Sequence, residues 1–173
     1  MIVWVIGLSG AGKSAIGAAV HREMKKDNAA TVLIDGDEIR RIFGNDQQAK
    51  DYSVEGRRRN AQRIRELCAW LDREGIDVVC CILSIFAEHQ AGNRKLFSDY
   101  FEVFVHANFD ALVERNPKNL YRLAMAGKED NVVGVDIEFV PPANPDIVIE
   151  NNEPFREPDL IAKDICEAIR FRQ

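Results

Sequence analysis

The chain has 173 residues, 46% of them hydrophobic, which predicts one compact domain, residues 1–173, with a sizeable core. Its formal net charge of −5 argues against a protein that coats nucleic acid or an anionic membrane, because both favour a basic surface. No apolar run approaches the roughly 20 residues that span a bilayer, so we expect a soluble protein that binds neither nucleic acid nor membrane.

Short apolar runs alternate with longer segments of helical period, which is typical of a parallel sheet covered by helices on both faces. The predicted strands are residues 2–6, 31–34, 76–83, 101–105 and 146–149. The predicted helices are residues 13–26, 38–43, 57–74, 88–98 and 159–171. This alternation predicts an α/β fold with a five-stranded parallel sheet.

Residues 116–144 do not fit the alternation. A short helical stretch is followed by AGKEDNVVGVD and then by a proline-rich stretch. We predict that this segment is an excursion from the domain and not part of its core.

The cysteines are predicted to be reduced. Cys80 and Cys81 are adjacent in an apolar run, where strand side chains point to opposite faces, and the chain has no C-x-x-C pair. Buried thiols of this kind indicate a reducing compartment, so we expect a cytoplasmic protein. No signal peptide is expected before the first strand.

The sequence GLSGAGKS matches the phosphate-binding pattern G-x-x-x-x-G-K-[ST] and lies between a predicted strand and a predicted helix. Glycines let backbone N–H groups wrap phosphates, and the helix N-terminus adds partial positive charge. Lys13 would reach the β- and γ-phosphates, and Ser14 would offer its hydroxyl to Mg²⁺. The alternative is a glycine-rich turn without a ligand. The predicted residues for ATP and Mg²⁺ are Gly7, Leu8, Ser9, Gly10, Ala11, Gly12, Lys13 and Ser14.

Asp35-Gly36-Asp37 follows the second predicted strand, at the carboxyl end where ligands bind in open α/β sheets. One interpretation places Asp35 near Mg²⁺ or makes it the base for an attacking hydroxyl. The other is a turn in which Asp37 caps the helix at residues 38–43. The two interpretations are compatible. The run of three arginines from Arg57, taken alone, is more typical of a solvated helix face.

Taken in order, several segments resemble the adenylylsulfate kinases: GLSGAGKS, DGDEIR, YSVEGRRRN, the strand that ends in Leu83-Ser84, RNPKNLYRLAMAG, and VVGVD followed by prolines. The resemblance covers nearly the whole chain. It implies the P-loop NTPase fold, a three-layer α/β/α sandwich with a lid segment at about residues 116–144. It also implies a kinase that uses ATP and Mg²⁺ to phosphorylate the 3′-hydroxyl of adenylyl sulfate, commonly as a homodimer.

The resemblance also implies roles for single residues. It places Asp35 beside the 3′-hydroxyl and the metal, and it puts Lys13, Ser84 and Lys118 with Asp35 among the catalytic residues. Arg115 falls on the ATP side of the lid. The residues implied for the accepting nucleotide are Asp37, Arg40, Tyr52, Arg57, Asn60, Leu83, Lys118 and Val132.

The departures from the family pattern concentrate on the acceptor side. The family's lid sequence Phe-Thr-Gly-Ile-Asp begins here with Val132, so a second aromatic face for adenine is missing. The family's Ser-Pro-Tyr-Arg becomes Ser84 to Ala87, without the proline and the arginine. One stacking partner contributes about 1–3 kcal/mol and one hydrogen bond to a charged group about 1.5–3 kcal/mol. These losses would weaken the binding of adenylyl sulfate.

Three hypotheses follow. The first is phosphorylation of adenylyl sulfate to 3′-phosphoadenylyl sulfate. The second keeps the chemistry and changes the acceptor to another activated nucleotide, such as cytidine diphosphoramidate, whose kinases are similar to this family. The third is a non-catalytic nucleotide-binding module, against which the retention of Lys13, Ser14, Asp35 and Lys118 argues.

Overall fold

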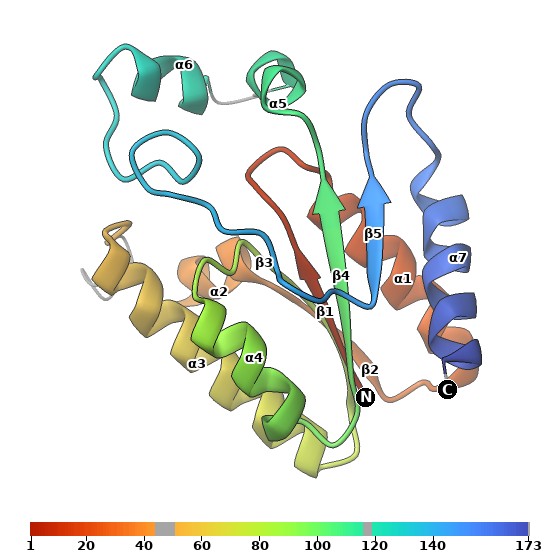
Figure 1. Cartoon of the computed structure of the whole chain (residues 1–173). Helices are drawn as coiled ribbons and strands as arrows, with labels where there is room; N and C mark the ends of the chain where they lie inside the picture. Colours follow the sequence, from red (N-terminus) through yellow and green to blue (C-terminus); the bar gives the residue numbers. More distant parts are fainter. Residues whose placement is uncertain (44–50, 116–118, 173) are drawn as a thin grey trace.

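A parallel sheet forms the centre of the computed structural model, which describes residues 1–43, 51–115 and 119–172. Its strands are β1 (Ile2–Ile6), β2 (Thr31–Asp35), β3 (Asp77–Ile82), β4 (Tyr100–His106) and β5 (Ile147–Glu150). They lie in the order β2-β3-β1-β4-β5, and every neighbouring pair is parallel (Figure 1). All carboxyl ends therefore meet at one edge of the sheet.

Helices cover both faces of this sheet, as the α/β/α prediction requires. On one face lie α1 (Lys13–Asp27) and α7 (Pro158–Phe171), and on the other lie α3 (Val54–Arg73) and α4 (Ala87–Leu96) (Figure 1). Three shorter helices lie toward the edge where the strands end: α2 (Gly36–Ile42), α5 (Phe109–Arg115) and α6 (Leu120–Met125).

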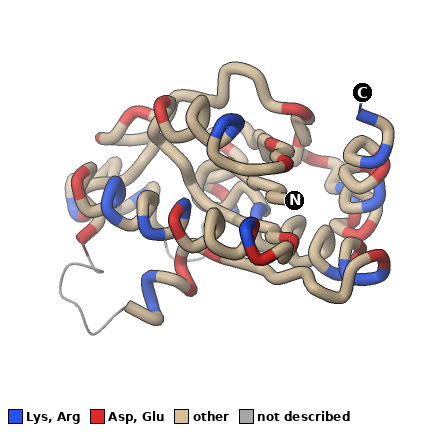
Figure 2. Tube along the Cα trace, turned by 90° about the horizontal axis from the view of Figure 1, so that it is seen from below, with Lys and Arg blue, Asp and Glu red and all other residues tan. Residues whose placement is uncertain are grey.

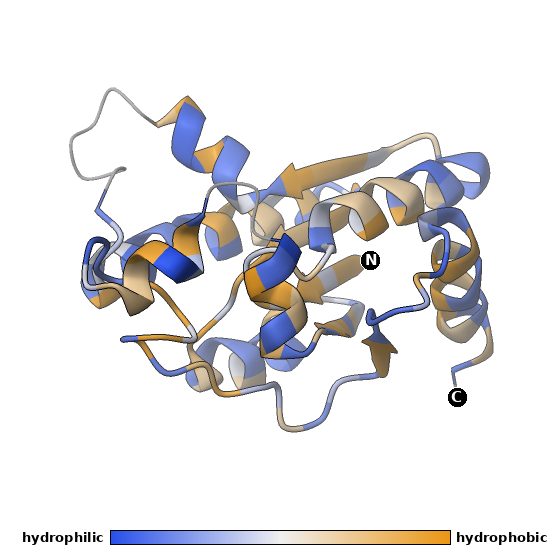
Figure 3. Cartoon of the chain, turned by 90° about the horizontal axis from the view of Figure 1, so that it is seen from above, coloured by the Kyte–Doolittle hydropathy of each residue, from blue (hydrophilic) through white to orange (hydrophobic). Residues whose placement is uncertain are grey.

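The alternation of side chains along the strands divides the core in two. Every residue of the central strand β1 is buried; Val3 and Val5 face α1 and α7, while Trp4 faces α3. Cys81 lies in the half of the core with Val3 and Val5, and Cys80 lies in the half with Trp4. The adjacent thiols are therefore on opposite faces of the sheet, as predicted. Figure 3 shows the same division, with apolar strands between helices that have one apolar and one polar side.

The observed strands begin and end within one residue of the predicted positions, whereas the helices differ more. Helix α3 begins at Val54, not at residue 57, because the Ser53 hydroxyl caps it by accepting a 3.1 Å hydrogen bond from the Gly56 N–H. Helix α5 was not predicted. Helix α2 begins at Gly36 and its N-cap is Asp35, so the prediction that Asp37 caps this helix is wrong.

The segment predicted as an excursion is partly built into the core. Tyr121 and Val132 are 1% and 3% exposed and pack in the cluster beneath α1 and α7. The Tyr121 hydroxyl also donates a 2.9 Å hydrogen bond to the Ser9 carbonyl. For these two residues the prediction of an excursion is wrong. Their side chains belong to the core because burial of apolar surface stabilises the folded chain.

The cysteine side chains are buried, as the sequence predicted. All four cysteines are free and buried, and burial raises the pKa of Cys81 to about 12 and that of Cys166 to about 11. Figure 2 shows Lys and Arg interspersed with Asp and Glu along the helices. None of the helices in the described part of the chain is long and apolar enough to cross a membrane.

Candidate active site

The loop from Gly7 to Ser14, called the P-loop below, connects β1 to α1 and depends on its glycines. Gly12 has a φ of +102°, which L side chains rarely adopt. A Cβ atom on Gly7 would collide with the carbonyl oxygen of Val105. The Asn151 side chain, directly after β5, supports the loop by donating a 2.8 Å hydrogen bond to the Ala11 carbonyl. The backbone is therefore held in one shape before any ligand binds.

Lys13 lies across the hollow of the P-loop. Its Nζ donates a 2.8 Å hydrogen bond to the Leu8 carbonyl oxygen. Burial lowers the pKa of the Lys13 ammonium, and the nearby carboxylates of Asp37 and Asp35 act in the opposite direction. A partly desolvated cation beside backbone N–H groups is suited to bind phosphate oxygens.

Ser14 and Asp35 meet at the entrance of the P-loop. The Ser14 hydroxyl donates a 2.6 Å hydrogen bond to Asp35 Oδ2, and Asp35 Oδ1 accepts a 2.9 Å hydrogen bond from the Asp37 N–H. This second bond fixes the carboxylate while it caps α2. Mg²⁺ prefers oxygen ligands and is commonly held by one or two protein groups together with phosphate oxygens. The Ser14–Asp35 pair fits that requirement.

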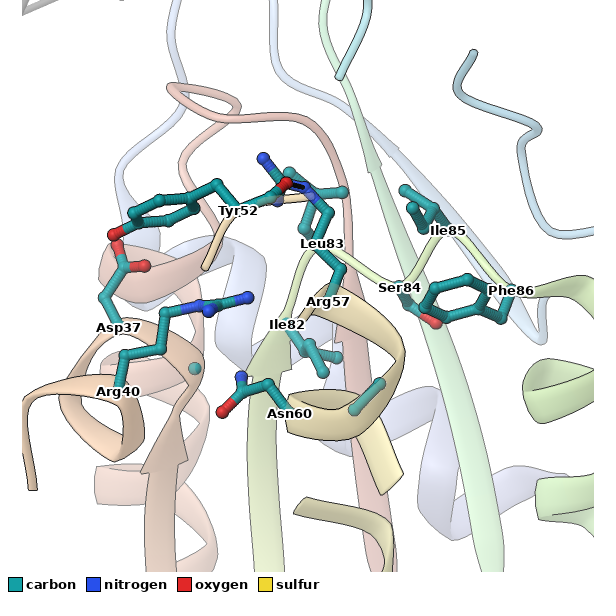
Figure 4. Close-up of a pocket in the computed structure, with 12 residues that line it drawn as sticks. Asp37, Arg40, Tyr52, Arg57, Asn60, Ile82, Leu83, Ser84, Ile85 and Phe86 are labelled. Carbon is teal, nitrogen blue, oxygen red and sulfur yellow. Dashed lines mark hydrogen bonds between the residues drawn. The ribbon is translucent and has the colours of Figure 1, made fainter. Parts of the chain in front are cut away.

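A pocket lies beside this pair, between α2, the start of α3 and the loop after β3. Figure 4 shows Asp37, Arg40 and Tyr52 on one side of it and Ser84 and Phe86 on the other. We call this the inner pocket; it has a volume of about 80 Å³. Its lining contains seven of the residues implied by the family resemblance: Asp37, Arg40, Tyr52, Arg57, Asn60, Leu83 and Ser84. Segments far apart in the sequence thus meet at one place.

Asn60 and Ser84 are polar side chains of the inner pocket that are mostly buried. Each of them is 7% exposed. Ser84 has a φ of +50°, and the Gln90 side chain supports that conformation by donating a 2.9 Å hydrogen bond to the Ser84 carbonyl. Because both side chains line the inner pocket, they are suited to bind a polar ligand there.

Tyr52 and Arg57 also line a wider space, which we call the outer pocket. It has a volume of about 270 Å³ and is bounded by residues 129–133 and by Ser9 of the P-loop. The guanidinium carbon of Arg40 lies 4.8 Å from the centroid of the Tyr52 ring, and that of Arg57 lies 5.5 Å from it. A flat aromatic group can stack in a space of this kind.

The three arginines of the run at 57–59 have separate partners. Arg57 donates hydrogen bonds to the Tyr52 and Asn131 carbonyls, and Arg59 forms a 2.7 Å ion pair with Asp51. Arg58 pairs with Glu88 and lies 4.2 Å from the centroid of the Phe86 ring. Arg58 is exposed, as a solvated face requires, whereas Arg57 lines both pockets, so the run does not form one uniform solvated face.

Arg115 lies at the end of α5 and lines neither the inner nor the outer pocket. It donates a hydrogen bond to the Asn151 carbonyl and lies 4.3 Å from the centroid of the Phe155 ring. Both Arg115 and Phe155 line a cavity of about 490 Å³. Sequence reasoning missed Asn151 and Phe155. The available signal was the polar pair Asn151-Asn152, which comes directly after a strand at the carboxyl edge.

Two of the implied residues need separate mention. Lys118 lies outside the described residues. Val132 lines the outer pocket, but its side chain is 3% exposed and packs into the core. Apart from Arg115, the remaining implied residues form two adjoining sites that meet at Asp35 and Asp37: a phosphate-binding loop, and a pair of pockets with polar, cationic and aromatic groups. This arrangement can bring a phosphate group and a second ligand together.

Comparison with known proteins agrees with this geometry. Residues 1–150 match the family model described as adenylylsulphate kinase. The chain is 36% identical over 151 residues to the cytidine diphosphoramidate kinase of Campylobacter jejuni, covering 87% of this chain and 86% of that protein. It is 34% identical over 178 residues to the adenylyl-sulfate kinase of Pseudomonas aeruginosa, covering 99% and 86%.

Among solved structures, the fold is similar to that of the APS kinase of Mycobacterium tuberculosis in complex with AMPPNP and APS. The TM-score is 0.84 with 30% sequence identity, over 98% of this chain and 96% of that one. This likeness of fold extends over nearly the whole chain.

Proposed function

The chain belongs to the adenylylsulphate kinase family and is a nucleotide kinase, and we propose that it transfers the γ-phosphate of ATP to the ribose 3′-hydroxyl of adenylyl sulfate. The product would be 3′-phosphoadenylyl sulfate. The observation that carries this proposal is the position of Asp35: it hydrogen-bonds Ser14 of the P-loop at 2.6 Å and stands next to Asp37, which lines both pockets.

On the donor side, the residues from Gly7 to Ser14 would hold the phosphates of ATP. Lys13 would leave the Leu8 carbonyl and bind the β- and γ-phosphate oxygens, which attract its desolvated ammonium more strongly than a carbonyl does. Ser14 and Asp35 would hold Mg²⁺, which when bound neutralises the charge of the phosphates. Arg115 and Phe155 would bind the base of ATP, and Lys118 with the lid would exclude water.

On the acceptor side, Asp35 would orient the 3′-hydroxyl and accept its proton. Phosphoryl transfer needs mainly positioning and charge neutralisation, so the other groups act by binding. Tyr52 would stack on the base in the outer pocket. Asp37, Arg40, Arg57, Asn60, Leu83 and Ser84 would hold the ribose and the anionic 5′ head group in the inner pocket.

A coupled assay of ADP release with adenylyl sulfate tests the proposal. The substitution Asp35→Asn keeps the shape of the side chain but removes the proton acceptor, so we expect turnover to fall about 100- to 10,000-fold while the affinity for ATP is unchanged. Full turnover of Asp35→Asn would exclude this role. Tight ATP binding without ADP release, with any nucleotide acceptor, would instead support a non-catalytic binding module.

Cytidine diphosphoramidate is the second candidate acceptor. Two departures from the family pattern favour it: Val132, whose buried side chain offers no stacking face, and Ala87, which stands where the family has an arginine. The relative from Campylobacter jejuni carries this substrate in its name. Assays with both nucleotides at equal concentration compare kcat/KM directly, and a higher value for the cytidine compound would replace adenylyl sulfate as the proposed acceptor.

We also propose a homodimer in the cytoplasm. The homodimer is carried over from the family resemblance, and the location rests on the four free, buried thiols. Light scattering of the purified protein at micromolar concentration tests the first, and a monomer mass would exclude it.

A further inference from the structure

The turn at residues 131–137 touches both halves of the site. Residues 131–133 line the outer pocket together with Tyr52. On its other side the turn packs against the P-loop, since a Cβ atom on Gly134 would lie 3.5 Å from a methyl carbon of Leu8. The position of this turn therefore affects the space available to the acceptor.

Asp136 holds the turn together from within. Its Oδ2 accepts a hydrogen bond from the Asn131 N–H and its Oδ1 accepts one from the Val132 N–H, each at 2.5 Å. Asn131 has a φ of +64°, a left-handed conformation that asparagine adopts more readily than most residues with a side chain. The two bonds to one carboxylate stabilise that conformation and so fix the direction of the Asn131 carbonyl.

Arg57 connects this carbonyl to the opposite wall of the outer pocket. Its Nη2 donates to the Asn131 carbonyl at 2.7 Å, and its Nε donates to the Tyr52 carbonyl at 2.8 Å. Because the guanidinium is planar and rigid, two bonds from one group fix the separation of the two segments. Desolvation raises the pKa of Asp136, but the two N–H bonds and the charge of Arg57 bring it below its usual range.

We propose that Asp136 is a positioning residue of the acceptor site. It orients the Asn131 carbonyl toward Arg57 and thereby sets the width of the outer pocket between Tyr52 and Val132, where the base of the acceptor binds. This inference rests on the proposed function, which assigns the outer pocket to the acceptor. Asp136 acts through the main chain of Asn131 and Val132 and does not touch the reacting atoms.

The test compares Asp136→Ala with Glu138→Ala, a matched control that removes an exposed carboxylate two residues away. The acceptor is whichever of adenylyl sulfate and cytidine diphosphoramidate the wild-type enzyme turns over. We expect Asp136→Ala to raise the KM for the acceptor about 10- to 100-fold and to leave the KM for ATP unchanged. Asp136→Asn retains one acceptor oxygen and should give an intermediate KM, while Glu138→Ala should behave as wild type.

An unchanged KM for the acceptor, or an equal rise in both KM values, would overturn the inference. Hydrogen exchange of the peptide that contains Asn131 and Val132 gives a readout independent of turnover. Faster exchange in Asp136→Ala but not in Glu138→Ala supports the inference, and equal exchange overturns it. The wild-type assay decides the proposed function separately: without ADP release for either acceptor that function fails, and the exchange rates still decide whether Asp136 holds the turn.

Discussion

The proposed donor and acceptor halves of the site are built in different ways. The P-loop is eight consecutive residues whose backbone makes the site, and its side chains match the family pattern throughout. The acceptor half is made of side chains from α2, α3, the loop after β3 and the turn at 131–137, and the departures from the family pattern concentrate on this side. A site made by backbone tolerates little change, whereas one made by side chains from several segments can be altered one residue at a time.

The same difference explains where support is needed. The P-loop is held by glycine geometry and by side-chain hydrogen bonds from Asn151 and Tyr121. The outer pocket depends on two hydrogen bonds, one that joins Asn131 to Asp136 and one that joins Arg57 to Asn131. Changes in the donor half should therefore reduce transfer with every acceptor, whereas changes in the acceptor half should alter the choice of acceptor.

Among the variants that test this division, the largest effect is expected for Lys13→Ala in the donor half. It removes the cation from the P-loop, and we expect kcat to fall about 100- to 1,000-fold with every acceptor, because charge stabilisation at the transferring phosphate is lost. Steady-state ADP release measures the loss. Lys25→Ala, an exposed lysine of the same helix, is the control and should keep wild-type turnover. A loss confined to one acceptor would contradict the division into two halves.

The next effect concerns the backbone of the P-loop. In Gly7→Ala the new methyl group would collide with the Val105 carbonyl, so we expect the free energy of unfolding to fall by about 1–3 kcal/mol and ATP binding to weaken. In the control Gly92→Ala the nearest atom, 3.2 Å away, is the flexible end of Arg65, which can move aside. Chemical denaturation measures both variants. Equal stability of Gly7→Ala and wild type would show that the loop adapts more readily than its geometry indicates.

The sequence alone predicted the position of the P-loop between a strand and a helix, but it predicted the elements around the two pockets less well. A contiguous motif between a strand and a helix determines its own geometry, so the P-loop needed no knowledge of distant contacts. Helix α5, which has seven residues, was missed. The capping role of Asp35 was missed because α2 begins two residues earlier than expected, at Gly36.

Position 132 shows most clearly what local sequence cannot predict. The family resemblance implies that Val132 replaces a phenylalanine that would stack on the base of the acceptor. Its side chain instead packs in the core, because Asp136 and Arg57 fix the backbone of the turn. The direction of the Val132 side chain therefore depends on Arg57, which lies 75 positions earlier in the chain. No pattern within the VVGVD segment contains that information.

Restoring the aromatic residue of the family sharpens this point. We expect Val132→Phe to lower the free energy of unfolding by about 1–3 kcal/mol, because the position is buried, and not to lower the KM for adenylyl sulfate. Val135→Phe, in the same turn but 37% exposed, should leave stability near wild type. Thermal unfolding and acceptor kinetics measure both variants. A lower KM with unchanged stability would mean that position 132 faces the acceptor after all.

The smallest effect is expected in the middle of β4, outside both halves. Glu102 is 3% exposed; burial raises the pKa of its carboxyl, although the Tyr100 hydroxyl donates a 2.6 Å hydrogen bond to it. A raised pKa in the folded state means that the folded protein binds this proton more tightly than the unfolded chain. The resulting stabilisation is complete below the ordinary glutamate pKa and is lost as the pH rises through the raised value.

Glu102→Gln removes the titration while keeping an acceptor for Tyr100. The free energy of unfolding of this variant should decline less steeply than that of wild type as the pH rises above the ordinary glutamate pKa, with kcat unchanged for every acceptor. Urea denaturation across a pH series measures the difference, and Glu167→Gln, an exposed glutamate of α7, is the control. Identical pH profiles for Glu102→Gln and wild type would mean that this buried carboxyl does not titrate differently in the folded and unfolded states. A change in kcat would show that Glu102, in the sheet beneath the site, affects phosphoryl transfer. We do not expect such a change, because Glu102 lines neither of the two pockets.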